Sequence, residues 1–92
     1  MNIRYEEQFK NALYAISSYI SKDKPSASYN FKKDLKSKIE DMSHNPKIYR
    51  ASYYFDDENY RDLTFKGYTI IYKIEDENNL ISILDIFKWV EK

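Results

Sequence analysis

The spacing of apolar residues changes from a helical period in the first half of the chain to a strand period in the second. Two early stretches place apolar residues every three or four positions, which is the spacing of one face of an amphipathic helix. These residues are Phe9, Leu13, Ile16 and Ile20, followed by Ala27, Phe31, Leu35, Ile39 and Met42. The pattern predicts a helix over about residues 6–21 and a second helix that begins at Pro25.

Prolines mark both boundaries of the second helix. Pro25 suits a first helical turn, because its φ angle is already fixed and its missing N–H has no helical partner there. The second helix should end at residues 43–46, because the residue before Pro46 is pushed out of the helical region. Helices joined by only about four residues form an antiparallel hairpin. Their shared apolar side then needs a second layer to pack against.

The second half of the chain supplies that layer. Residues 60–65, 68–74 and 80–87 are rich in β-branched and aromatic side chains, and short turns separate them. They predict three strands of a meander, with Gly67 providing the positive φ of a tight hairpin. Residues 2–5 alternate as a short edge strand would.

The predicted middle strand has one face for the helices. Its alternate residues Tyr68, Ile70, Tyr72 and Ile74 share a side, which we expect to face the helical hairpin. The fold class is therefore α+β: an N-terminal short strand and a helical hairpin packed on a twisted antiparallel sheet of three to four strands. We expect a single domain over residues 1–92.

Residues 47–58 allow two interpretations. They contain Tyr49, Tyr53, Tyr54 and Phe55, followed by three acidic residues. The segment forms either a fourth short strand or an aromatic-lined loop.

Composition removes several classes of function. The 92 residues include no cysteine, which excludes disulfide frameworks, zinc ribbons and thiol nucleophiles. Glycine-rich phosphate loops and histidine pairs at ligand spacing are also missing from the sequence. We therefore expect no metal and no cofactor.

Residues 80–90, the longest near-apolar stretch, are about half a membrane span, and no signal peptide precedes Arg4. These features predict a cytoplasmic protein with no membrane association.

Charge and aromatic residues are unevenly distributed. Residues 1–50 hold ten bases and six acids, whereas residues 51–92 hold five bases and nine acids. Six of the ten tyrosines lie between Tyr49 and Tyr72, too many for all of them to point inward. Exposed rings among basic residues suit either base stacking or a groove that captures a helix of a partner. The residues alone favour partner binding.

The order of motifs resembles the RelE/ParE toxin superfamily of type II toxin–antitoxin systems. The resemblance covers nearly the whole chain and rests on order, spacing and length together. The matching residues are Ile3 and Tyr5, Phe9, Leu13, Ile16, Tyr19, Ile20, Pro25, Ala27, Phe31, Leu35, Ile39, Asn45-Pro46, Tyr49-Arg50, Arg61, Leu63, Gly67-Tyr68, Ile70, Tyr72, Ile81, Ile83-Leu84 and Ile86-Phe87. It implies a toxin that arrests bacterial growth and is neutralised by a cognate antitoxin, which alone would bring it to operator DNA.

The superfamily has two branches with different targets. RelE-like members cleave mRNA on the ribosome with a set of cationic residues, and ParE-like members poison DNA gyrase by binding. The cleaving branch typically has an arginine where this chain has Thr69, and lysines near Tyr60 and Asp62. The resemblance is therefore closer to the ParE-like branch. A non-toxic member that acts only as an antitoxin-binding corepressor is a further alternative.

The ribonuclease and the binding hypothesis each predict a set of site residues. If the protein is a ribonuclease, Arg61, Lys66 and Lys88 are the catalytic candidates, with Tyr68 or His44 for proton transfer. A second set is expected to bind the target or the antitoxin. Its members are Arg50, Tyr54, Tyr60, Arg61, Lys73, Lys88 and Trp89.

Overall fold

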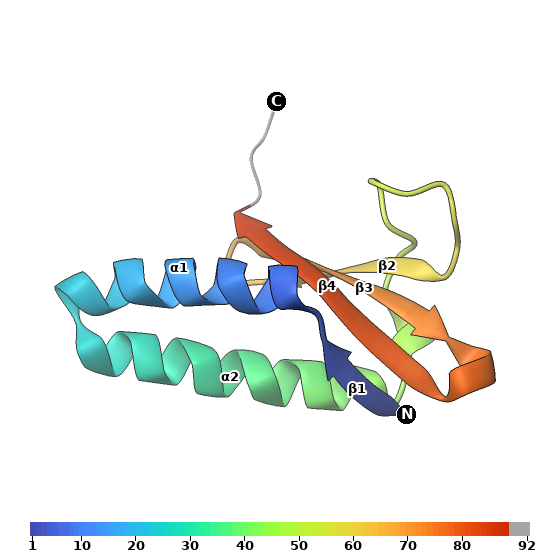
Figure 1. The fold of residues 1–92 in the computed structure, drawn as a ribbon, viewed down its shortest axis with the longest axis horizontal. Coiled ribbons are helices and arrows are strands. Elements are labelled where there is room, and N and C mark those ends of the chain that lie inside the picture. Colours follow the sequence, from blue (N-terminus) through green and yellow to red (C-terminus); the bar gives the residue numbers. More distant parts are fainter. Residues whose placement is uncertain (89–92) are drawn as a thin grey trace.

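The computed structural model describes residues 1–88 and arranges them as a helical hairpin against a four-stranded sheet (Figure 1). The elements in chain order are β1 (Asn2–Tyr5), α1 (Glu7–Asp23), α2 (Pro25–Ser43), the 3-10 helix η1 (Pro46–Ile48), β2 (Tyr60–Phe65), β3 (Tyr68–Glu75), the 3-10 helix η2 (Asp76–Asn78) and β4 (Leu80–Lys88). The predicted α+β class, both helices and all four predicted strands are confirmed. Within these residues, no helix is both long and apolar enough to cross a membrane.

The sheet has the strand order β1-β4-β3-β2 and is mixed. Strands β2, β3 and β4 form the predicted antiparallel meander. Strand β1 instead pairs parallel to β4, with Ile3 opposite Ile81. The expectation of a wholly antiparallel sheet was wrong in this one respect. Parallel neighbours need a long crossover, and the helical hairpin with β2 and β3 provides it.

The two helices are joined through a single residue, Lys24, which caps both of them. Helix α1 therefore runs two residues beyond its predicted end. The Ser28 hydroxyl donates a hydrogen bond of 2.8 Å to the carbonyl oxygen of Ser17, and both serines are buried. Small side chains with a direct helix-to-helix bond let the helices lie close together, side by side (Figure 1).

The core lies between the hairpin and one face of the sheet, which we call the inner face. Its buried residues come from every predicted apolar stripe. They are Phe9, Phe31, Leu35, Ile39, Met42, Leu63, Ile70, Tyr72, Ile74, Ile81, Ile83 and Ile86. The predicted inward face of β3 is confirmed: Ile70, Tyr72 and Ile74 are buried in this core, and Tyr68 packs against Phe31 of α2. Tyr68 is only partly buried and packs against the edge of this core.

Tyr72 ties the sheet to the segment that follows the helices. Its ring is fully buried, and its hydroxyl donates a hydrogen bond of 2.6 Å to the carbonyl oxygen of Pro46 in η1. A buried tyrosine needs such a partner for its hydroxyl group. Burial also raises the pKa of the Tyr72 hydroxyl well above its usual value. The bond fixes the point where the chain leaves the helices.

The turn between β2 and β3 consists of Lys66 and Gly67. Both residues have positive φ, at 50° and 84°. A two-residue hairpin of this type requires positive φ at both central positions, because only then does the turn match the twist of the strands. The glycine was predicted to adopt it, and the lysine shares the same conformation.

Residues 49–59 form a loop, with only a brief pairing to β2. Ala51 makes an isolated antiparallel bridge with Arg61. The Ser52 N–H donates to the carbonyl oxygen of Tyr60 at 2.7 Å, and the Asp62 N–H donates to that of Arg50 at 3.2 Å. The chain then turns away, so the loop interpretation of this segment is confirmed and the strand interpretation is wrong.

Candidate functional site

The loop of residues 49–59, which we call the aromatic loop, lies over the face of the sheet opposite the helices. We call that face the outer face. The backbone N–H of Tyr53 donates to the buried carboxylate of Asp62 on β2 at 3.2 Å. The Tyr54 ring meets Phe87 on β4 edge-on, with 5.2 Å between ring centres. Since β3 runs between β2 and β4, the loop crosses β3 and covers it.

Thr69 on β3 lies beneath this crossing. It faces Thr64 on β2 and Phe87 on β4, and it is 0% exposed. Ile71, two residues further along the same face, is 5% exposed. The sequence alone did not predict that outward-pointing residues of the central strand would be buried.

Two of the exposed rings of the aromatic loop pack against neighbouring side chains. Tyr53, Tyr54 and Phe55 are 76%, 51% and 43% exposed. The Arg50 guanidinium carbon lies 4.0 Å from the centre of the Tyr53 ring, and Phe55 stacks on Tyr60 at 4.2 Å. Rings held in place in this way lose little freedom on binding, which suits them to a protein interface.

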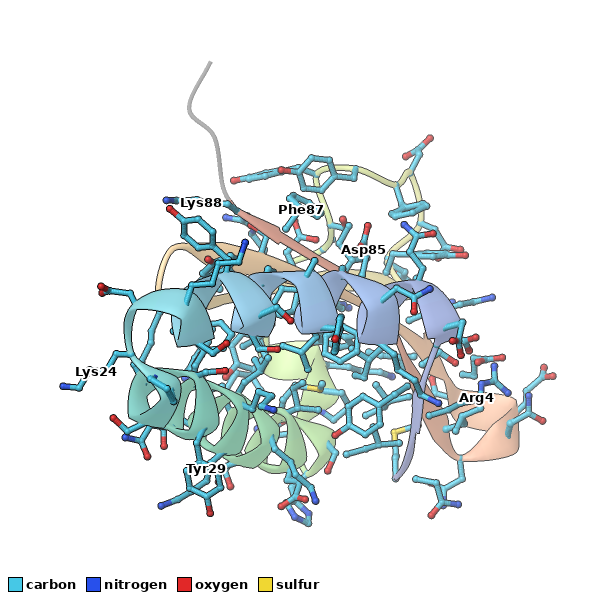
Figure 2. All side chains as sticks on the ribbon, turned by 60° about the vertical axis from the view of Figure 1, so that its left-hand side comes forward. Arg4, Lys24, Tyr29, Asp85, Phe87 and Lys88 are labelled. Atoms are coloured by element: carbon cyan, nitrogen blue, oxygen red, sulfur yellow. The ribbon has the colours of Figure 1, made fainter. Side chains whose placement is uncertain are left out.

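An open hollow of about 470 Å³ lies on the outer face beside the start of α1. We call it the outer groove. Its lining combines apolar residues from the loop and sheet with acidic and amide side chains. These residues are Phe55, Ile71, Leu84, Glu6, Glu7, Gln8 and Asp85. In Figure 2, Asp85 and Phe87 project from β4 on the opposite side of α1 from Tyr29, so the groove lies away from α2.

A second hollow, of about 340 Å³, lies between the two helices and has the opposite charge. We call it the hairpin groove. Its apolar residues are Tyr5, Phe9, Leu13, Leu35 and Ile39, and its only charged residues are Lys10, Lys32 and Lys36. Two lysines of α2, Lys32 and Lys36, thus lie beside an apolar floor, together with Lys10 from α1.

Arg61 is held by backbone carbonyl groups on the inner side of β2. Its Nε donates to the carbonyl oxygen of Glu58 at 2.8 Å. Its Nη1 donates to those of Tyr49 at 2.8 Å and Lys47 at 3.3 Å. The side chain therefore fastens both ends of the aromatic loop to β2.

The three ribonuclease candidates do not converge. Lys66 lies in the β2–β3 turn, where its ammonium group is 3.5 Å from the carboxylate of Asp34 on α2. Lys88 is exposed at the end of β4, opposite Tyr68. Arg61 lies near the start of β2 and Lys66 directly follows its end, so their backbones are separated by up to about 17 Å.

The remaining candidates have varied positions. The Lys73 ammonium group lies 5.5 Å from the centre of the Tyr60 ring, on the outer face. Tyr68 packs edge-on against Phe31 at 5.3 Å between ring centres, and His44 caps the end of α2. Trp89 lies outside the described residues. Among residues 1–88, no three acidic or histidine side chains come close enough to hold a metal ion.

Sequence comparison identifies the family. The profile described as "ParE toxin of type II toxin-antitoxin system, parDE" matches residues 3–89. The chain belongs to the ParE toxin family. It is therefore a member of a toxin family of type II toxin–antitoxin systems, as the resemblance implied. A search of curated proteins found no match.

Solved structures share the fold of this ParE family member. A chain of the chromosomal ParDE system from P. aeruginosa superimposes with a TM-score of 0.77 at 15% identity, covering 98% of this chain and 97% of the other. The isolated E. coli RelE toxin gives a TM-score of 0.70 at 14% identity, with 99% and 86% coverage. A chain of the intact E. coli RelBE complex gives 0.69 at 13% identity, with 98% coverage of both chains. Both branches of the superfamily are thus represented among these structures.

The two grooves of this ParE family member were not predicted from its sequence. The signal for the hairpin groove was present, since Lys10 and Lys36 flank the apolar stripes of their helices. Their meeting depends on the relative position of the two helices. The outer groove combines Phe55 with residues from α1, β3 and β4, and no local pattern connects these segments.

Proposed function

We propose that this protein arrests bacterial growth by binding and inhibiting DNA gyrase, and that a cognate antitoxin neutralises it. Family membership supports the toxin role, and the family is one whose systems pair a toxin with an antitoxin. The resemblance of the chain to the ParE-like branch supports gyrase as the target. Inhibition by binding requires an interface and no catalytic group.

Thr69 favours the gyrase-binding branch over the mRNA-cleaving branch. By the resemblance, it occupies the position where the cleaving branch typically has an arginine, and its side chain is buried. Asp62, near an expected lysine position, is a buried acid. Cleavage of a phosphodiester needs cations aimed at the phosphate where charge develops. The outer face of this protein presents a buried hydroxyl and a carboxylate at those positions, which favours binding over cleavage.

The first prediction concerns the target. The purified protein is expected to inhibit DNA supercoiling by gyrase and to leave mRNA intact on translating ribosomes. In cells, brief induction should lower DNA synthesis before protein synthesis, which pulse labelling of both resolves. An immediate fall in protein synthesis with cut mRNA would contradict the proposal. Absence of growth arrest at confirmed expression would instead favour a corepressor without toxicity.

Neutralisation is proposed to use the hairpin groove. An apolar floor with a rim of three lysines fits an amphipathic helix whose polar side is acidic, because the apolar side fills the groove and the acids meet the lysines. We therefore propose that an acidic amphipathic helix of the antitoxin binds between α1 and α2. The candidates Arg50, Tyr54, Tyr60, Lys73, Lys88 and Trp89 remain proposed contacts with the target or the antitoxin.

The second prediction tests the hairpin groove by reversing charge. The double variant Lys10→Glu/Lys36→Glu is expected to bind the cognate antitoxin at least tenfold more weakly, since acids would then face acids. Titration calorimetry with the purified antitoxin measures the change. Lys22→Glu/Lys24→Glu makes the same change in net charge at the tip of the hairpin and should leave the affinity nearly unchanged. An equal loss in both variants would remove the groove from the proposal.

A further inference from the structure

The floor of the outer groove is apolar. Ile71 and Leu84 contribute aliphatic side chains from β3 and β4, and Phe55 adds a ring from the aromatic loop. The pairing of β3 with β4 shifts at this point: Ile71 lies opposite Asp85 and Tyr72 opposite Ile83, which leaves Leu84 as an extra residue. Such a bulge re-aims side chains and is common next to functional sites. Here it adds a leucine to the groove.

The rim of the outer groove is acidic. Glu6, Glu7 and Asp85 line it, with no lysine or arginine among the lining residues. Gln8 donates a hydrogen bond of 2.9 Å to the Asp85 carboxylate, which orients that group without neutralising it. Among the described residues, only Glu6 of these three acids has an ion pair, with Arg4 at 2.7 Å. The uncompensated negative charge favours a cationic occupant and repels phosphate groups.

Phe55 gives the groove a fixed aromatic wall. Its ring is 43% exposed and stacks on Tyr60 with 4.2 Å between ring centres and an angle of 17° between ring planes. Arg61 and Asp62 fasten the surrounding loop to β2. Aromatic side chains that are held in place beside apolar pockets are the usual energetic centres of protein interfaces. The groove therefore has both an anchor and a charge preference.

We infer that the outer groove binds a segment of the target protein in which an apolar side chain lies next to lysine or arginine. This inference rests on the proposed function, because it names the chemistry of the target segment. The apolar side chain would contact Phe55, Ile71 and Leu84, while the cation would face Glu7 and Asp85. The two grooves have opposite charge and lie on opposite sides of α1, which assigns them to different partners.

Two peptide probes test the groove without any knowledge of the target. The ¹⁵N-labelled protein is titrated with the peptide Ac-KLKLKLK-NH₂ and, separately, with Ac-ELELELE-NH₂, and backbone amide shifts are followed by NMR. The lysine peptide is expected to shift Glu7, Phe55 and Leu84, and the glutamate peptide should leave these three amides unmoved. Equal shifts with both peptides, or no shift at this groove with either, would overturn the inference.

Neutralising the rim tests the partner assignment. The double variant Glu7→Gln/Asp85→Asn keeps side-chain size and the hydrogen-bonding capacity toward Gln8. Its affinity for the lysine peptide and its potency in inhibiting gyrase are each expected to fall at least tenfold. Its affinity for the antitoxin should stay unchanged. The control Asp41→Asn/Glu77→Gln makes the same charge change away from the groove and the aromatic loop, and it should behave as the unmodified protein. Thermal denaturation verifies that both variants are folded.

The outcomes separate this inference from the proposed function. If antitoxin affinity falls while gyrase inhibition is retained, the groove binds the antitoxin and the assignment to the target is overturned. If the unmodified protein does not inhibit gyrase, the proposed function fails. The peptide titration still decides whether the groove selects cationic apolar segments.

Discussion

Replacement of Leu35 by aspartate is expected to unfold the protein at ordinary temperatures. Leu35 is 1% exposed and belongs to the core between α2 and the sheet. The substitution removes a buried aliphatic side chain and places an unpaired carboxylate among Phe9, Ile39 and other apolar residues. Loss of a buried leucine alone costs about 2–5 kcal/mol, and burial of an unpaired charge adds to this cost. The sum is comparable with the whole stability of a small domain, about 5–15 kcal/mol.

Circular dichroism during heating measures this effect. We expect Leu35→Asp to show no cooperative transition, or one far below that of the unmodified protein. Lys33→Asp introduces the same side chain two residues earlier, at an exposed position of the same helix. Its melting temperature should change only slightly, because surface substitutions usually stay within about 0.5 kcal/mol. Similar melting for the two variants would contradict the described packing of α2.

Arg61→Ala is expected to lower the free energy of unfolding by about 2–3 kcal/mol. Hydrogen bonds from charged groups are each worth about 1.5–3 kcal/mol when buried, and partial exposure reduces this value. Arg61 makes three such bonds to backbone carbonyl groups of Lys47, Tyr49 and Glu58. Its removal would also release the aromatic loop from β2. Toxicity would then fall through loss of structure, without any role for Arg61 in chemistry.

Urea denaturation of Arg61→Ala and Lys66→Ala compares how much each of these two side chains contributes to stability. Lys66 has one exposed ion pair, with Asp34 at 3.5 Å, and such pairs contribute about 0–1 kcal/mol. The midpoint for Lys66→Ala should stay close to that of the unmodified protein, whereas that for Arg61→Ala should fall clearly. A normal midpoint for Arg61→Ala together with lost toxicity would instead support a direct role of the guanidinium group.

The parts of the fold that were predicted correctly depend on local patterns. Helical spacing in residues 9–42 and alternation in residues 68–74 identified the hairpin, the meander and most of the core. Pro25 and Gly67 marked boundaries for reasons of backbone conformation that act within one or two residues. Strand β1 was also recognised, but its parallel pairing with β4 joins residues nearly 80 positions apart. No local signal specifies that partner or its direction.

The candidate site was harder to predict because long-range contacts decide it. Thr69 alternates outward on β3, and its burial depends on contacts of Tyr53 and Tyr54 with two different strands. Arg61 was an evident cation in the sequence, but its bonds to carbonyl groups depend on the path of the aromatic loop. Residue type identified the charges correctly, and only the fold shows which charges remain available to a partner.

The pairing of β1 with β4 also constrains when the protein can acquire its structure during synthesis. β1 leaves the ribosome before the other described elements, yet the strand beside it, β4, is the last of them to be made. Until β4 emerges, Ile3 and Tyr5 have no neighbouring strand, and α1 lacks the part of the sheet on which it packs. Contacts between distant parts of a chain also form slowly. The sheet therefore stays incomplete until β4 has been synthesised, and a nascent chain interrupted before β4 is expected to be inactive.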